Sequence, residues 1–207
     1  MTLLMVVLLM VSAATFHAAI VEITIGSLTL AVICNILCLQ FAFSIPYDRL
    51  KLSENMLLTM DRAGFMGALL GSVMMPLAIF TGTLSVSGNP AGSELLYNKF
   101  LYSGLAFGFW ASYLIGRIRM GSEIWKSKKT NLLQVITSIL AFTMTITVAS
   151  IGGKIVRNES ILDLMPFWLP INKTVTLSPL ISILLLIIGA SSIFIMYKLD
   201  YSIDSKN

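Results

Sequence analysis

LLMVVLLMVSAATFHAAIVEITIGSLTLAVICNILCLQFAF, residues 3–43, decides the fold class of this chain. The stretch is almost continuously apolar, and its main polar interruptions are His17, Glu22, Asn35 and Gln40. About 20 apolar residues in a helix are enough to cross the hydrocarbon core of a bilayer. The stretch is therefore too long for one span, and it carries no break that would divide it into two.

The rest of the chain has the same character. The mean hydropathy is +0.88, and 57% of the residues are hydrophobic against 12% charged, which excludes an ordinary soluble globule. Beyond a first span at about 18–43, further apolar runs cover about 63–84, 99–118, 132–151 and 180–197. We therefore predict an all-α, polytopic membrane helical bundle of about five transmembrane helices.

Residues 1–14 have two interpretations, and residues 15–207 are expected to form a single transmembrane domain. An apolar core over residues 3–11, followed by Ser12, Ala13 and Ala14, is typical of a signal peptide, although no lysine or arginine precedes it. If the segment is retained, it extends the first helix to about 60 Å. Its apolar surface would then need a partner protein or a thicker membrane to cover it.

The basic residues predict the orientation. The net charge is +4, and the positive residues concentrate in the loops after the first and third spans, where the positive-inside rule explains them without nucleic acid. The C-terminus is then cytoplasmic and the N-terminus outside, as in a cell-membrane protein. Sequons at Asn158 and Asn172, possible glycosylation sites, lie in the loop after the fourth span and fit an outside location.

Two pairs of glycines predict where helices pack. Gly67 and Gly71 in the second span, and Gly104 and Gly108 in the third, have the four-residue spacing that lets helix backbones approach closely in lipid. A short loop joins these two spans, so they are expected to be antiparallel neighbours. We predict that the two glycine faces contact each other.

Three polar residues are the candidates for chemistry. His17 lies near the outer end of the first span, where a histidine can ligate haem or a metal, carry protons, or simply bond a backbone group. Glu22 lies about 7 Å deeper along a helix and points about 140° away from His17, so the two are not expected to share an ion. An ionisable group inside a span is a functional candidate. Glu22 is alternatively a neutral acid or a partner of Lys99, at the same predicted level.

Motifs for common enzyme chemistry are missing from the sequence. It contains no phosphate-binding Walker loop, no Gly-x-Ser-x-Gly, no HExxH and no paired carboxylates or charge cluster within the predicted spans. Cys34 and Cys38 lie on one face of the first span and are best interpreted as packed thiols. The sequence thus favours a non-catalytic protein.

Short motifs at the ends of the predicted spans resemble those of a known membrane family. They are TFHAAIV (15–21), TGTL (81–84), KFLYS (99–103), GR (116–117) and IGGKIVR (151–157). Over residues 15–163 the chain resembles the family known as domain of unknown function 2231. That resemblance implies a four-helix module in which one histidine opens the first span and another opens the third, with haem as a possible cofactor.

His17 matches the first of these histidines, whereas Lys99 stands at the second position. A protonated lysine is not an ordinary haem ligand. The resemblance therefore implies a scaffold that has lost the cofactor, with a contact from Lys99 to Glu22 or His17 in its place.

Together these patterns predict an integral accessory or structural subunit, surrounded by lipid and packed against other membrane subunits. The expected setting is a larger membrane oxidoreductase complex of the respiratory or ammonia/methane-monooxygenase type. Two alternatives stay open: a cytochrome-b-like electron carrier that binds haem through His17, and a small proton-coupled permease that uses Glu22.

Overall fold

The computed structural model describes residues 12–43, 52–85, 94–164 and 177–198, and every regular element in this part of the chain is a helix. The long helices are α2 (Ala13–Leu37), α3 (Glu54–Ser85), α4 (Glu94–Met120), α5 (Lys128–Arg157) and α7 (Pro179–Lys198). Short 3-10 helices are η1 (Cys38–Phe41), η4 (Gly121–Trp125) and η5 (Ile161–Leu164). The predicted all-α fold is confirmed.

Four helices are long and apolar enough to cross a membrane. They are α2 with η1, α3, α5 and α7, which supports an integral membrane protein. The helix α4 is as long as these, but it is less apolar because tyrosine, serine, glycine and tryptophan are interspersed along it. Many of these residues are buried against the other helices, so α4 lies in the interior of the molecule.

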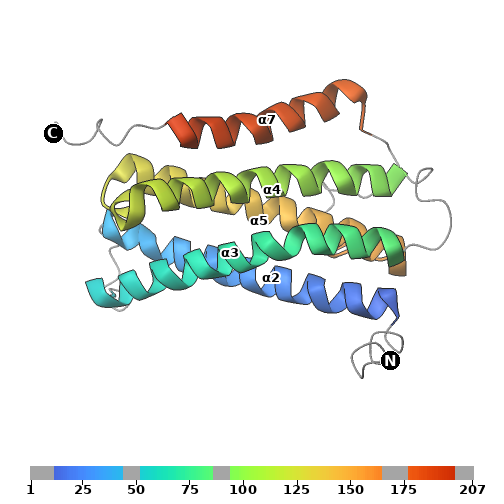
Figure 1. Ribbon diagram of the computed structural model, residues 1–207, viewed down its shortest axis with the longest axis horizontal. Helices are drawn as coiled ribbons and strands as arrows, with labels where there is room; N and C mark the ends of the chain where they lie inside the picture. The colour runs from blue at the N-terminus through green and yellow to red at the C-terminus, as the bar shows by residue number, and fades with distance from the viewer. Residues whose placement is uncertain (1–11, 44–51, 86–93, 165–176, 199–207) are drawn as a thin grey trace, which may run out of the picture.

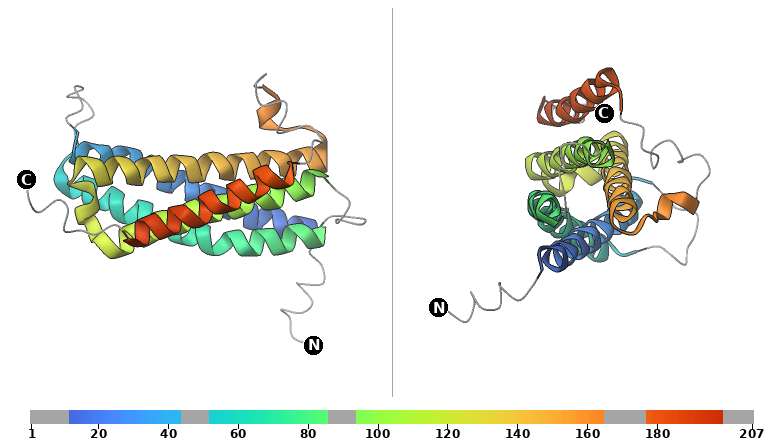
Figure 2. Two further views of the ribbon diagram at one scale, coloured as in Figure 1. Left: turned by 90° about the horizontal axis from the view of Figure 1, so that it is seen from above. Right: turned by 90° about the vertical axis from the view of Figure 1, so that its right-hand side faces the viewer.

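Helices α2 to α5 surround a common axis, and α7 lies outside this bundle against α4 (Figures 1 and 2). Successive helices run in opposite directions, so α2 begins at one end of the bundle and α7 ends at the other (Figure 1). One end carries the start of α2, the end of α3 and the start of α4. The opposite end carries η1, the start of α3, the end of α4 and η4.

The first long helix begins at Ala13, earlier than predicted. Ser12 has an extended backbone, and its side chain accepts a hydrogen bond from the Thr15 amide at 3.2 Å. This is the geometry of an N-cap, which satisfies an amide that has no partner within the helix. A helix does not run continuously through Ser12, and of residues 1–14, to which the two interpretations apply, residues 1–11 are outside the described residues.

The glycine pairs pack helices, but not against each other as predicted. A Cβ added to Gly67 would lie 2.7 Å from the Ser27 carbonyl oxygen of α2, so α3 approaches α2 through its glycines. A Cβ on Gly108 would lie 3.1 Å from the Gly189 Cα of α7. The two glycine faces therefore serve different neighbours, because the small-residue side of α3 faces α2 while that of α4 faces α7.

Candidate functional site

A buried ion pair joins α3 and α4 at the end of the bundle where α4 stops; we call this end the Asp61 end. The Asp61 side chain is 1% exposed, and its Oδ1 accepts a hydrogen bond from Arg117 Nε at 2.7 Å. Arg117 Nη2 donates to the second carboxylate oxygen, which makes the contact bidentate. Trp125 Nε1 of η4 adds a third donor to Oδ1 at 2.6 Å.

Amide and hydroxyl side chains continue this polar interior. Tyr113 donates its hydroxyl to Asn35 Oδ1 at 2.8 Å, and Gln134 Nε2 donates to the Tyr113 carbonyl oxygen at 2.8 Å. The Asn131 amide bridges the carbonyl oxygens of Trp125 and Cys38. These bonds connect α2, α4, α5, η1 and η4, so the network fixes how the helices meet at this end.

The Asp61 carboxylate is fully occupied by its three donors, so the arrangement suits a structural pair better than an acid or base. Sequence reasoning missed it, because it placed Asp61 and Arg62 in a connecting loop and found no charges in contact within the helices. The spacing of Asp61 from the small residues that follow it could have predicted that it is buried. Asp61 lies on the same side of the helix as the small residues Gly64 and Ala68, whereas Arg62 is exposed.

The opposite end of the bundle, the Lys99 end, holds His17. The Nδ1 atom of His17 lies 3.1 Å from Thr81 Oγ1 of α3, and Thr81 also donates to the Leu77 carbonyl oxygen. A Cβ on Gly82 would lie 2.9 Å from His17 Cε1, so this glycine makes room for the imidazole ring. The histidine therefore bonds a neighbouring side chain and ties α2 to α3.

Lys99 lies at this same end, and its ammonium group has no hydrogen-bonding or ionic partner among the described residues. Its side chain is half-buried, and its Nζ would be 3.1 Å from a Cβ placed on Gly152 of α5. Lys99 also lines a cavity of about 20 Å³, together with Gly82 and Ser103. This volume holds about one water molecule.

Glu22 is exposed on the outer face of α2, and within the described residues it forms no ion pair or hydrogen bond. The Lys99–Glu22 contact considered from sequence is therefore not formed, because Lys99 points into the bundle and Glu22 away from it. Glu22 lines neither the small cavity at Lys99 nor a larger groove between α3 and α4.

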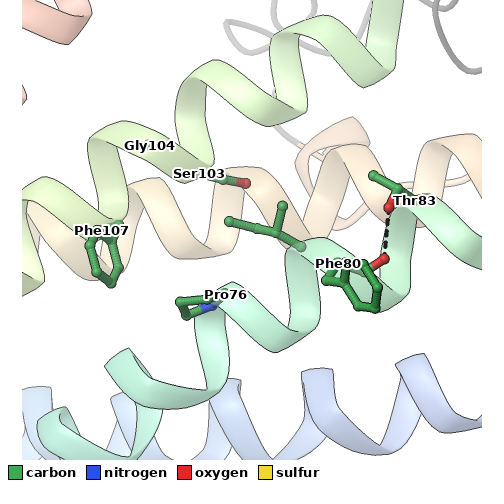
Figure 3. Close-up of a pocket in the computed structure, with 7 residues that line it drawn as sticks. Pro76, Phe80, Thr83, Ser103, Gly104 and Phe107 are labelled. Carbon is green, nitrogen blue, oxygen red and sulfur yellow. Dashed lines mark hydrogen bonds between the residues drawn. The ribbon is translucent and has the colours of Figure 1, made fainter.

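A groove opens between α3 and α4 beside the Lys99 cavity. Its volume is about 390 Å³. Its walls come from α3 and α4 and are mostly apolar, as Figure 3 shows. The lining residues are Pro76, Ile79, Phe80, Thr83, Ser103, Gly104 and Phe107. The groove and the smaller cavity share Ile79, Thr83 and Ser103, so the two spaces adjoin.

The residues at the Lys99 end do not fit haem. His17 lines neither the small cavity beside Lys99 nor the adjoining groove, so its imidazole faces no cofactor-sized space. His17 is the only histidine in the chain and bonds Thr81, and Lys99 takes the second position that the resemblance implies. Among the described residues, no three His, Cys, Asp or Glu side chains are grouped to hold a metal ion.

The remaining sequence candidates belong to neither the Asp61 ion pair nor the space around Lys99. Cys34 and Cys38 are buried free thiols, and Cys38 Sγ donates to the Leu57 carbonyl oxygen at 3.8 Å. Asn158 is exposed and terminates α5 in a left-handed conformation with φ of 60°. Asn172 is outside the described residues. No protein-family model, curated protein or solved structure matches this chain.

Proposed function

We propose that this protein is a non-catalytic integral membrane subunit that binds a partner protein through the outer face of α2. The observation that carries the proposal is the position of Glu22, a carboxylate on the outside of a membrane-spanning helix that pairs with no described residue. The oxidoreductase class of the complex remains a prediction from sequence.

Glu22 lies at a depth where lipid is a poor neighbour for it. Helix α2 and η1 together cover residues 13–41, and a hydrocarbon core of about 30 Å centred on them spans roughly residues 17–37. Glu22 is about 7.5 Å from the centre of this core, so its charge costs less there than the roughly 2.5–3.5 kcal/mol found for charged side chains at a bilayer centre. A hydrogen-bond donor or a basic side chain on a partner helix would offset this cost.

The surroundings of Glu22 suit a close helix contact. Ala18 and Gly26 lie one turn before and one turn after it on the exposed side of α2, and nothing lies within 4 Å of a Cβ on Gly26. Small residues at this spacing let a second helix backbone approach. The partner we infer is a transmembrane helix with a lysine, arginine or amide side chain at the level of Glu22.

The two alternatives from the sequence gain no support from the geometry. A proton-coupled permease needs its acidic group in a pathway through the protein, whereas Glu22 is on the outer face and lines neither described cavity. A haem carrier needs a cofactor space that the histidine faces and a second ligand, and within the described residues His17 lines neither the groove nor the small cavity.

We place the Asp61 end in the cytoplasm. Most described basic residues lie there, and the positive-inside rule assigns such residues to the cytoplasmic side. They are Arg62, Arg117, Arg119, Lys126, Lys128, Lys129 and Lys198, against Lys99, Lys154 and Arg157 at the other end. The start of α2 is then outside.

Native gels of gently solubilised membranes test the proposal. The full chain should migrate within a complex larger than its own 22.6 kDa, and Glu22→Leu should release it. Glu54→Gln is the matched control, because Glu54 is an exposed acid outside the α2 face. Migration of the unaltered protein as a free chain would contradict the subunit role. If the complex survives Glu22→Leu, Glu22 is not needed for the contact, and the subunit role still stands.

A further inference from the structure

The groove between α3 and α4 has the form of a site for a hydrocarbon chain. Phe80 and Phe107 form two of its walls, and Pro76 lies at its floor (Figure 3). Gly104 lies at the edge of the groove beside α7, because a Cβ there would touch only Leu186, at 3.9 Å. Its volume of about 390 Å³ lies within the range of ligand sites in proteins, roughly 300–1,000 Å³.

The hydroxyl groups in the groove are already used. Thr83 donates its hydroxyl to the Phe80 carbonyl oxygen at 2.7 Å, the bond drawn in Figure 3. Ser103 donates to the Lys99 carbonyl oxygen at 2.7 Å. Neither side chain has a hydrogen left for a ligand, so the groove presents apolar contacts and no polar donor of its own.

Lys99 adds a positive charge at one end of this apolar channel. It lines the small cavity that adjoins the groove, and no described residue neutralises it. Lys99 and Phe107 are eight positions apart on α4, about 12 Å along the helix axis. A lipid has the same layout, with a charged headgroup followed by an apolar chain.

We propose that this groove binds one lipid with an anionic headgroup. Its acyl chain lies along Pro76, Phe80 and Phe107, and its phosphate lies at the end of the groove next to the small cavity, where the charge of Lys99 attracts it. This assignment rests on the groove and on Lys99, which both lie away from the outer face of α2, and does not depend on the proposed subunit role.

Native mass spectrometry of the purified full-length protein tests the site. Phosphatidylglycerol and phosphatidylcholine with identical chains are titrated in parallel, and one phosphatidylglycerol should bind about fivefold more tightly, the preference expected from one lysine. Lys99→Met should abolish the preference, whereas Lys99→Arg should keep it. Arg157→Met removes an exposed cation at the same end and should leave the preference unchanged.

Two further variants separate the groove from the charge. Thr83 lines both the groove and the small cavity, so Thr83→Phe should fill the groove and weaken both lipids, whereas Thr83→Val keeps the size of the side chain and should bind normally. Equal binding of the two lipids, or a preference that survives Lys99→Met, would overturn the proposal. Binding of glycerol 3-phosphate as tight as that of phosphatidylglycerol would assign Lys99 to a free anion instead. Circular dichroism confirms that each variant is folded.

Discussion

The buried charges at the two ends of the bundle differ in their partners among the described residues. At the Asp61 end, a carboxylate that is 1% exposed meets three donors from α4 and η4. At the other end, Lys99 is half-buried among helices and meets no partner within the described residues. Burying a charge is tolerated when it is paired and bonded. The first arrangement is therefore complete within the described helices, whereas these helices leave the Lys99 ammonium group without a partner.

Removing the Asp61 charge should have the largest effect on stability. Asp61→Asn leaves Arg117 buried without its counter-ion, and breaking a buried pair in this way costs roughly 3–5 kcal/mol. Reversible unfolding in mixed micelles measures the loss. Glu123→Gln is the matched control, because the Glu123–Lys126 pair has side chains 44% and 60% exposed, and such pairs contribute about 0–1 kcal/mol.

The double variant Asp61→Asn with Arg117→Met removes both charges and should recover part of the stability lost in the single variant. An Asp61→Asn protein as stable as the Glu123→Gln control would show that the Asp61 end is not held by its ion pair.

The two glycine faces should respond differently to the same substitution. Gly67→Ala places a methyl group 2.7 Å from a backbone oxygen of α2, and overpacking costs roughly 1–3 kcal/mol. Gly104→Ala meets no close neighbour and gains about 1 kcal/mol of helix propensity. The free energies of unfolding of the two variants should differ by about 2 kcal/mol, given these opposing effects. Equal stabilities would refute the close approach of α3 to α2.

Lys99→Met should stabilise the delipidated protein, because it replaces an unpaired cation by an apolar side chain of similar length. The expected gain is about 1 kcal/mol, the lower part of the range measured for unsatisfied buried polar groups. Thermal unfolding in a neutral detergent measures it. A loss of stability would mean that Lys99 already has a partner in the folded chain and that the contrast between the two ends is wrong.

The sequence was sufficient for the fold class because apolar runs of span length leave few alternatives to helices in a membrane. It was insufficient for the contacts between the helices. The spacing of Gly67 and Gly71 predicted a close-packed face but could not say which helix covers it. Asp61 was expected in a loop because two adjacent charges, Asp61 and Arg62, resemble the end of a span. Its position three residues before Gly64, however, puts it on the side of α3 that faces the other helices.

The candidate residues divide in the same way. The number of residues between each candidate and the end of its span predicts its depth in the membrane. His17 and Lys99 were therefore expected at one level, and both lie at the same end of the bundle. The directions of the side chains depended on helix packing. Glu22 and Lys99 were therefore considered as partners, whereas the packing turns one outward and the other inward.

Photo-crosslinking in native membranes tests the central claim, that α2 offers an outward face to a partner protein, most directly. A photoreactive amino acid at Ile23, which is 47% exposed beside Glu22, should give one discrete protein adduct, and Glu22→Leu should remove it. The same probe at Leu77 of α3, 46% exposed, should give lipid adducts. Lipid adducts alone at Ile23 would contradict the claim, whereas a protein adduct unchanged by Glu22→Leu would keep the contact and remove only Glu22 from it.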